Sequence, residues 1–103
     1  MLAVIFEVEM NEGQDQRYFD LAAGLRSELE KIDGFVSVER FQSLTTQGKY
    51  LSLSIWRDEA AVKAWRSHVG HQDAQRQGKS GIFKDFRIRV ADVLRDYNLR
   101  DRL

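Results

Sequence analysis

Residues 50–69, YLSLSIWRDEAAVKAWRSHV, contain the change of period that decides the fold. Over residues 50–56 the side chains alternate, which is typical of a strand with two different faces. One face carries Leu51, Leu53 and Ile55. The other face carries Tyr50, Ser52, Ser54 and Trp56. Asp58 then provides a cap for a helix. The apolar positions of that helix are spaced three or four residues apart, at Ala61, Val62, Trp65 and Val69.

The continuation of this helix is less regular. Gly70 is expected to bend or interrupt it, because glycine in a helix interior costs about 1 kcal/mol. Residues 71–77, HQDAQRQ, are able to resume the helix, and residues 78–81, GKSG, close it.

The flanking segments repeat the same two periods. Residues 2–10 alternate as a strand, residues 15–32 have helical spacing with Asp15 as a possible cap, and residues 35–42 and 84–96 alternate again. The short turn between residues 42 and 50 makes a hairpin. The order β-α-β-β-α-β predicts a single α+β domain over residues 1–103. It is the ferredoxin-like fold, with an antiparallel four-stranded sheet and two helices on one face.

Composition limits the classes of function. The 16 basic residues balance 16 acidic ones, so no basic excess indicates a nucleic-acid partner. The chain has no cysteine, which excludes disulfides and thiolate metal sites. The N-terminus alternates with glutamates, unlike a signal peptide, and no apolar run approaches the length of a membrane span. We expect a soluble, cytoplasmic protein without a nucleic-acid or membrane partner.

The sheet face without helices is expected to be buried by a second copy of the chain. Ile5 and a Val or Phe of the second strand lie on this face, and an uncovered apolar face indicates a partner. Glu7 and Glu9 share the face, and Arg87 and Arg89 of the last strand are their expected ion partners. The tail at residues 95–103, RDYNLRDRL, is expected to wrap the partner subunit or to fray.

One short stretch holds the residues that are suited to chemistry. Trp65 offers a flat apolar ring and one N–H donor, and its spacing fits both core packing and a pocket wall. His68 and His71 are three apart, so they share a helical face, and either one could move a proton near neutral pH. Two histidines alone make a poor metal site, so no metal is expected. Phe6 and Phe86 are predicted to line the same cavity as Trp65.

Two stretches, SIWRDEAAVKAWRSHVGHQDAQ (residues 54–75) and FKDFRIRVADVLRDY (residues 83–97), resemble the antibiotic biosynthesis monooxygenase family of the dimeric α+β barrel superfamily. The resemblance implies a homodimer packed sheet to sheet. Trp65 corresponds to the family's tryptophan. The asparagine that polyketide oxygenases carry one turn earlier falls on Ala61 here, and their arginine on the last strand corresponds to Arg87 or Arg89. The first strand lacks the asparagine of haem-degrading members.

The resemblance implies a cofactor-independent monooxygenase that acts on a small aromatic, phenolic or quinol compound with molecular oxygen. Trp65, Phe6 and Phe86 would bind the substrate, His71 or His68 would transfer a proton, and Arg87 would be a charge partner. The chain shows no nucleotide-binding glycine motif, so no flavin is expected. The alternatives are a non-catalytic small-molecule-binding or stress-response dimer, and a haem-binding or haem-degrading protein.

Overall fold

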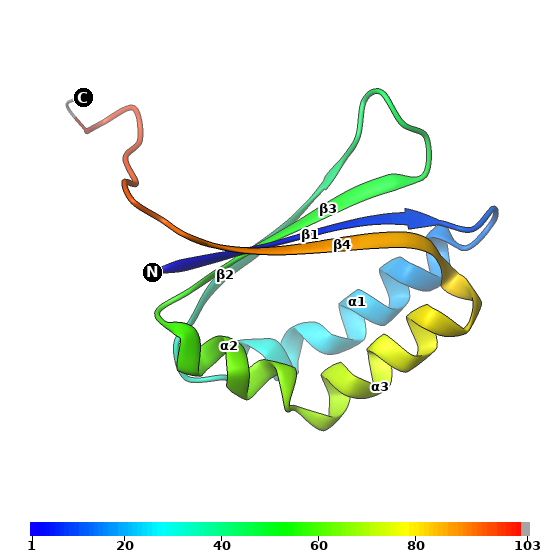
Figure 1. The fold of residues 1–103 in the computed structure, drawn as a ribbon, viewed down its shortest axis with the longest axis horizontal. Helices are drawn as coiled ribbons and strands as arrows, with labels where there is room; N and C mark the ends of the chain where they lie inside the picture. The colour runs from blue at the N-terminus through cyan, green and yellow to red at the C-terminus, as the bar shows by residue number, and fades with distance from the viewer. Residues whose placement is uncertain (102–103) are drawn as a thin grey trace.

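The computed structural model describes residues 1–101, except for the side chains of residues 69–71, and residues 102–103 lie outside the described part. Figure 1 shows one sheet with all the helices beneath a single face. Along the chain the elements are β1 (Leu2–Met10), α1 (Asp15–Glu30), β2 (Phe35–Gln42), β3 (Lys49–Trp56), α2 (Glu59–Arg66), α3 (Val69–Gln77), the π-helical turn η1 (Gly78–Ile82) and β4 (Phe83–Asp92).

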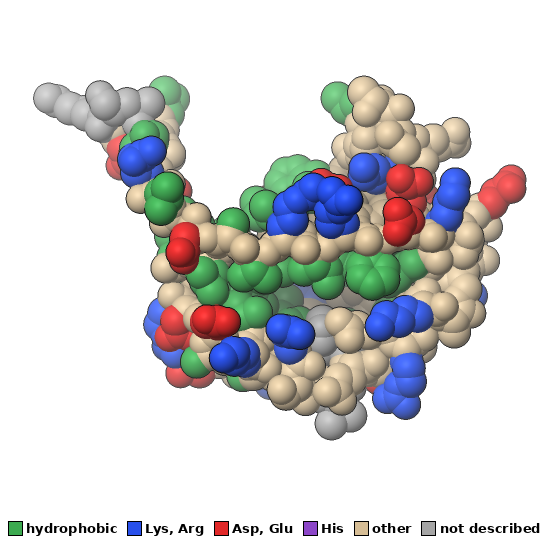
Figure 2. Space-filling view, in the orientation of Figure 1, with side chains coloured by type: hydrophobic (Ala, Val, Ile, Leu, Met, Phe, Trp, Pro, Cys, Tyr) green, Lys and Arg blue, Asp and Glu red, His purple; other side chains and the backbone are tan. Residues whose placement is uncertain are grey.

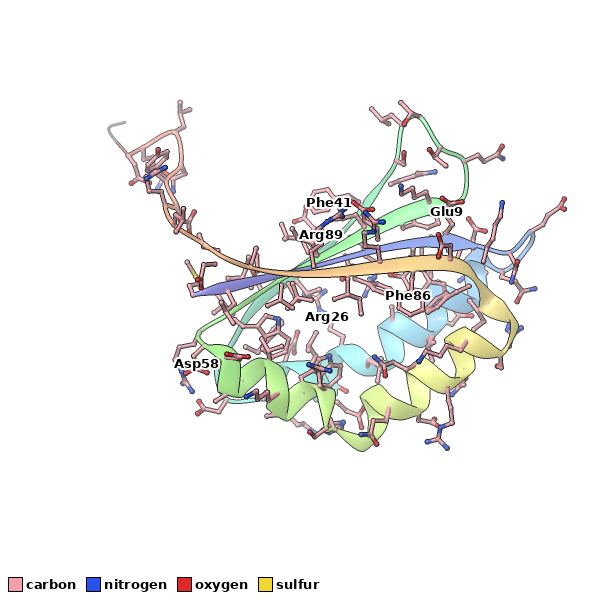
Figure 3. The ribbon with its side chains drawn as sticks, viewed as in Figure 1. Glu9, Arg26, Phe41, Asp58, Phe86 and Arg89 are labelled. Atoms are coloured by element: carbon pink, nitrogen blue, oxygen red, sulfur yellow. The ribbon has the colours of Figure 1, made fainter. Side chains whose placement is uncertain are left out.

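The four strands are all antiparallel and lie in the order β2-β3-β1-β4, which confirms the ferredoxin-like fold. The register places Val8 opposite Phe86 and Glu7 opposite Arg87. Val8 belongs to the core beneath the sheet, so Glu7 and Arg87 lie on the other side. We call that other side the open face. Figure 3 shows Phe41, Arg89 and Glu9 on it, and Phe86, Arg26 and Asp58 on the helix side.

Two clusters of buried side chains hold the helices against the sheet. Near α1 and η1 the buried cluster consists of Val8, Met10, Tyr18, Tyr50 and Ile82. Near α2 it consists of Leu29, Trp56, Ala61 and Val62. Among the described sheet side chains packed against these clusters, three come from β1 and two from β2, whereas β4 contributes only Phe83, from its first position. The helices therefore leave most of β4 uncovered.

The helical layer differs from the prediction in the place of its break. Residues 59–77 form two helices, and the break lies at Ser67 and His68 rather than at Gly70. The His68 N–H donates to the Trp65 carbonyl at 3.0 Å, and the His68 carbonyl accepts the Gln72 N–H at 3.0 Å. His68 therefore makes a backbone hydrogen bond at the end of α2 and another at the start of α3. Gly70 falls in the first turn of α3, where backbone N–H groups have no intrahelical partner anyway.

The prediction of Asp15 as a helix cap was wrong. Gln14 occupies the N-cap position without a side-chain hydrogen bond, and Asp15 is the first helical residue. Its carboxylate instead accepts a 2.5 Å hydrogen bond from the Tyr50 hydroxyl. This bond, followed by burial, raises the pKa of Tyr50. Asp15 therefore ties the start of α1 to β3.

Asp58 is the cap of α2, as the sequence predicted. Its carboxylate accepts the Ala61 N–H at 3.0 Å and the Arg57 Nε–H at 3.0 Å. The Ala61 N–H, and then Arg57, lower the pKa of Asp58 below its ordinary value. Because β3 ends at Trp56, this cap fixes the direction in which α2, and with it Trp65, leaves the sheet.

The cap gives a prediction for pH dependence. A carboxylate with a lowered folded-state pKa contributes stability above its unfolded pKa of about 3.9, and this contribution is lost as pH falls through the folded value. We expect Asp58→Asn, which keeps a good capping side chain, to match the wild type near pH 7. Toward about pH 3 it should lose less stability than the wild type. Urea unfolding at both pH values measures this, and identical acid profiles would contradict it.

Among the described residues, no helix is long and apolar enough to cross a membrane.

Candidate functional site

An apolar groove runs between β4 and the layer formed by α2 and α3. Phe86, Ile88 and Val90 point to the helix side of the sheet, yet they are 42%, 47% and 54% exposed. Figure 2 shows a hydrophobic band below β4 and a recess between this band and the helices. We call this feature the β4 groove. It exists because β4 is an edge strand that the helices do not reach across to cover.

The exposed apolar side chains of the β4 groove follow the strand from Phe86 to Val90. Phe86 and Val90 are four residues apart, which corresponds to about 13 Å along a strand. At the Phe86 end, Phe6 and Phe83 pack beside it with ring centroids 6.0 and 6.3 Å from Phe86. This end is therefore an aromatic wall, formed partly by Phe6 of β1. Phe6 and Phe86 are thus neighbours, and that they line one cavity with Trp65 stays a prediction.

Trp65 and His68 lie at the other end. Trp65 is half-buried and packs against the cluster that also receives Leu2 and Val4. Val4 is the register partner of Val90, so Trp65 packs at the Val90 end of the sheet. The His68 ring stacks on the Trp65 indole, with centroids 5.3 Å apart and planes inclined by 28°. The last residues of α2 and the break that follows thus place an imidazole beside an indole.

The α2 helix explains why Trp65 is held in this place. Ala61 and Trp65 are four residues apart, so they follow one another on the same face of the helix. Ala61 is 2% exposed, and a Cβ added at Gly34 would come within 2.6 Å of its methyl group. Because Gly34 has no side chain, this face of α2 can pack closely against the end of the sheet. Trp65, one turn later, is half-buried and packs against the cluster near α2.

Two predicted site residues fall elsewhere. The side chain of His71 lies outside the described residues, although its backbone belongs to α3. Arg87 lies on the open face, across the sheet from the β4 groove and opposite Glu7 in the register. Within one chain the structure therefore does not bring Arg87 together with Trp65.

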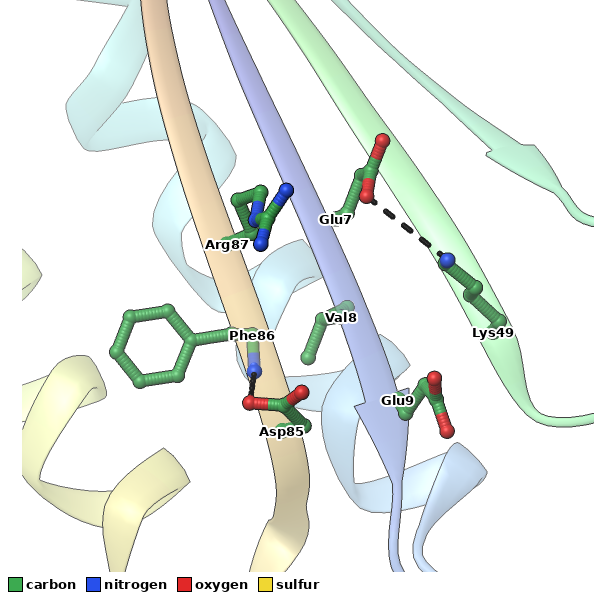
Figure 4. A pocket seen from close by; sticks show the side chains of 7 residues that line it. All are labelled: Glu7, Val8, Glu9, Lys49, Asp85, Phe86 and Arg87. Atoms are coloured by element: carbon green, nitrogen blue, oxygen red, sulfur yellow. Dashed lines mark hydrogen bonds and ion pairs between the residues drawn. The ribbon is translucent and has the colours of Figure 1, made fainter.

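The open face holds a network of charges instead. Glu7 accepts a hydrogen bond from Arg89 at 3.2 Å and forms an ion pair with Lys49 at 3.8 Å. Glu7 and Lys49 also line a hollow of about 210 Å³, together with Glu9, Asp85 and Arg87 (Figure 4). The partners predicted for Glu7 were Arg87 and Arg89, and Arg89 is the one that binds it.

Sequence reasoning missed two sets of residues. Ile88 and Val90 were assigned to the same face as Phe86, but their exposure on the groove was not foreseen. The apolar side chains of β3, Leu51, Leu53 and Ile55, lie on the open face beside Ile5. The signal was present in the same strand, because its opposite face carries Tyr50 and Trp56, which are the large aromatic residues that fill the core.

Comparison with known proteins gives a family. A family model described as antibiotic biosynthesis monooxygenase matches residues 1–77. The jasmonate monooxygenase ABM of Pyricularia oryzae is 43% identical over 93 residues, which are 90% of this chain and 43% of that protein. The protein YqjZ of Bacillus subtilis, described as uncharacterized, is 32% identical over 91 residues, 88% of this chain and 77% of that one. This chain thus spans less than half the length of the Pyricularia protein.

Solved structures share the fold. A candidate antibiotic biosynthesis monooxygenase from Deinococcus radiodurans superposes with a TM-score of 0.86 at 15% identity, over 98% of this chain and 100% of that chain. At this identity the likeness concerns the arrangement of strands and helices alone.

Proposed function

The chain belongs to the antibiotic biosynthesis monooxygenase family, and from this membership we propose that it is a monooxygenase that oxidises a small aromatic, phenolic or quinol compound in the β4 groove without a cofactor. The observation that carries the proposal is the stacked pair of Trp65 and His68 near one end of an apolar groove. An indole offers a face for an aromatic ring, and the adjacent imidazole is a group able to exchange protons.

Each residue has a distinct part in the proposed reaction. The aromatic walls at Trp65, Phe6 and Phe86 bind the ring and keep water away from it. His68, or His71 on the following turn, accepts the phenolic proton, which leaves an electron-rich anion that reacts with molecular oxygen. One oxygen atom enters the substrate and the other leaves as water, and the substrate supplies both electrons and both protons of that water. Arg87 serves as a charge partner on the open face.

We propose that the active form is a homodimer packed through the open faces. Ile5, Leu51, Leu53 and Ile55 form an apolar centre on this face, and Phe41 beside them is 45% exposed. An apolar surface of this kind favours burial against a second copy around a two-fold axis. The network of Glu7, Lys49 and Arg89 would then line the edge of the interface.

Oxygen uptake in the presence of a model naphthohydroquinone tests the function. We expect the wild type to exceed the background rate without added flavin or metal. We expect His68→Ala to be about a hundredfold slower, since general base catalysis contributes about 10²–10⁴-fold. Gln72→Ala, which removes an exposed polar side chain of α3, is the matched control and should keep the full rate. His71→Ala decides which of the two imidazoles accepts the proton.

A wild-type rate equal to background would contradict the catalytic proposal. Ligand binding without oxygen uptake would then favour a non-catalytic binding protein. Addition of haem tests the remaining alternative, because haem bound to the chain would shift the Soret band.

Jasmonate is a second candidate substrate, because the relative named for it is 43% identical over 93 residues. The two candidates differ in electron balance. A quinol supplies its own electrons, whereas insertion of one oxygen atom into a C–H bond consumes two electrons from a separate donor. Jasmonate turnover should therefore require an added reductant such as a reduced nicotinamide, and mass spectrometry would detect a product heavier by one oxygen atom. Turnover of the quinol should be independent of the reductant.

A further inference from the structure

Gly78 is a buried glycine at a position where the backbone does not require glycine. Within η1 only Ser80 and Gly81 depart from helical backbone angles, and Gly78 is buried. The glycines with a positive φ are Gly13, Gly34, Gly48 and Gly81. Alanine would suit the backbone at Gly78 better than glycine does, because glycine loses more conformational freedom on folding. The reason for a glycine here therefore lies in the space around it.

The ring of Phe83 occupies the space that a side chain at Gly78 would need. A Cβ added at Gly78 would lie 2.3 Å from Phe83 Cε2, 2.7 Å from Cζ and 2.8 Å from Cδ2. Carbon atoms in contact lie about 3.5–4.0 Å apart. A methyl group at position 78 would therefore displace the Phe83 ring.

The backbone beneath this ring is held in place. The Asn11 side-chain amide donates to the Gly81 carbonyl at 2.9 Å and to the Phe83 carbonyl at 3.3 Å. The Asn11 N–H donates to the Ile82 carbonyl at 2.9 Å. These bonds tie the end of η1 and the start of β4 to the residue that follows β1. A clash at Gly78 is therefore relieved by movement of the Phe83 ring rather than of its backbone.

The neighbours of the ring decide where it can move. Phe83 packs against Tyr18, Phe6 and Phe86 with ring centroids 5.9, 5.8 and 6.3 Å away. Tyr18 is 5% exposed and belongs to the core, which is close-packed and yields little. Phe86 is 42% exposed and faces the β4 groove, so among these neighbours it has the most room to give way. A side chain at Gly78 would thus act on the groove through Phe83 and Phe86.

From these contacts we propose that Gly78 determines how large a ligand the β4 groove accepts, because the space that it leaves free keeps the Phe83 ring from crowding Phe86. The inference rests on the proposed function and deepens it, since it identifies the residue that admits quinols with a second fused ring. Gly78 acts through Phe83, so it is a positioning residue and not a catalytic one. Trp65 and His68, at the other end of the groove, keep their places whatever residue stands at position 78.

Anaerobic titrations of Gly78→Ala with hydroquinone and with the larger naphthohydroquinone test the proposal. We expect the Kd for naphthohydroquinone to rise about tenfold or more, which is the effect of a misfit of one carbon group in an apolar pocket. The Kd for hydroquinone should stay unchanged. In oxygen uptake with naphthohydroquinone the loss should appear in KM rather than in kcat. Gly24→Ala is the matched control and should keep both Kd values, because Gly24 is exposed in α1 and an added Cβ there has nothing within 4 Å.

A second substitution separates the position of the ring from general damage. Phe83→Val removes all three ring atoms that the new methyl group would meet, so Gly78→Ala with Phe83→Val should recover most of the affinity for naphthohydroquinone. A merely structural role of Gly78 would lower the stability without changing the ratio of the two Kd values. If Gly78→Ala alone does not fold, Phe83→Val alone decides, because an unchanged ratio in that variant would overturn the proposal.

The outcomes distinguish this inference from the proposed function. If neither quinol binds to the wild type, the β4 groove is not the ligand site and both are overturned. If both quinols bind and Gly78→Ala keeps their ratio, or weakens both equally without rescue by Phe83→Val, the role of Gly78 alone is overturned. A changed ratio with rescue, in a protein whose oxygen uptake stays at background, would support the role of Gly78 and overturn the catalytic proposal.

Discussion

If the proposed homodimer forms through the open faces, replacing Leu53 by aspartate is expected to convert it into a monomer of about 12.0 kDa. Leu53 lies in the middle of the open face, opposite Ile5 on one side and Glu39 on the other. The side chain is outside both buried clusters, so the substitution leaves the core of the single chain intact. In the interface it places an unpaired carboxylate in an apolar environment, which costs several kcal/mol. A cost of about 4 kcal/mol corresponds to roughly thousandfold weaker association.

Sedimentation velocity over a range of concentrations measures this change, and circular dichroism checks that the fold is kept. Gln72→Asp is the control, because it adds the same charge at an exposed position of α3. The control should remain dimeric. If the Leu53→Asp protein also keeps the dimeric mass, the open face is not the interface.

Trp56→Ala is expected to cost about 3–5 kcal/mol of folding free energy, the range for removing a buried large aromatic side chain. Trp56 is 1% exposed, and its indole meets the Phe35 ring edge-on with centroids 5.4 Å apart. Its Nε1–H donates to Ser54 Oγ at 2.9 Å, so the truncation also leaves this hydroxyl without its donor. Because single domains are stable by only about 5–15 kcal/mol, the loss is a large part of the total.

Urea unfolding of Trp56→Ala beside Trp65→Ala tests this assignment of the two tryptophans. Trp65 is only half-buried, so its truncation should cost clearly less stability. It should instead weaken the binding of an aromatic ligand. Equal losses of stability in the two variants would contradict the distinction between a core tryptophan and a groove tryptophan.

The faces of the strands were predictable from the sequence, because alternation has a period that only a strand produces. The grouping of Phe86, Ile88 and Val90 on one face is an example. The break in the second helix was misplaced, since Gly70 was judged as a residue of a helix interior. Its position in the first turn of α3 depends on where α2 ends, at Arg66.

The candidate site was predictable only in part. The proximity of Trp65 and His68 follows from their spacing on and just after a helix. The groove itself does not follow from the sequence. It depends on the position of β4 as an edge strand and on how many strands of the sheet the helices cover. The same limit applies to Arg87, whose face was predicted correctly but whose separation from Trp65 depends on which sheet face the helices occupy.

The most direct test of the account follows the two indole N–H signals of the ¹⁵N-labelled protein during an anaerobic titration with a naphthohydroquinone. The chain has only two tryptophans, so each signal reports one place. If the β4 groove is the ligand site, the Trp65 signal and the amides of residues 86–90 should shift. The Trp56 indole is buried and donates a hydrogen bond to Ser54, so its signal should keep its chemical shift. An unchanged Trp65 signal at saturating ligand, or shifts restricted to the open face, would contradict the account.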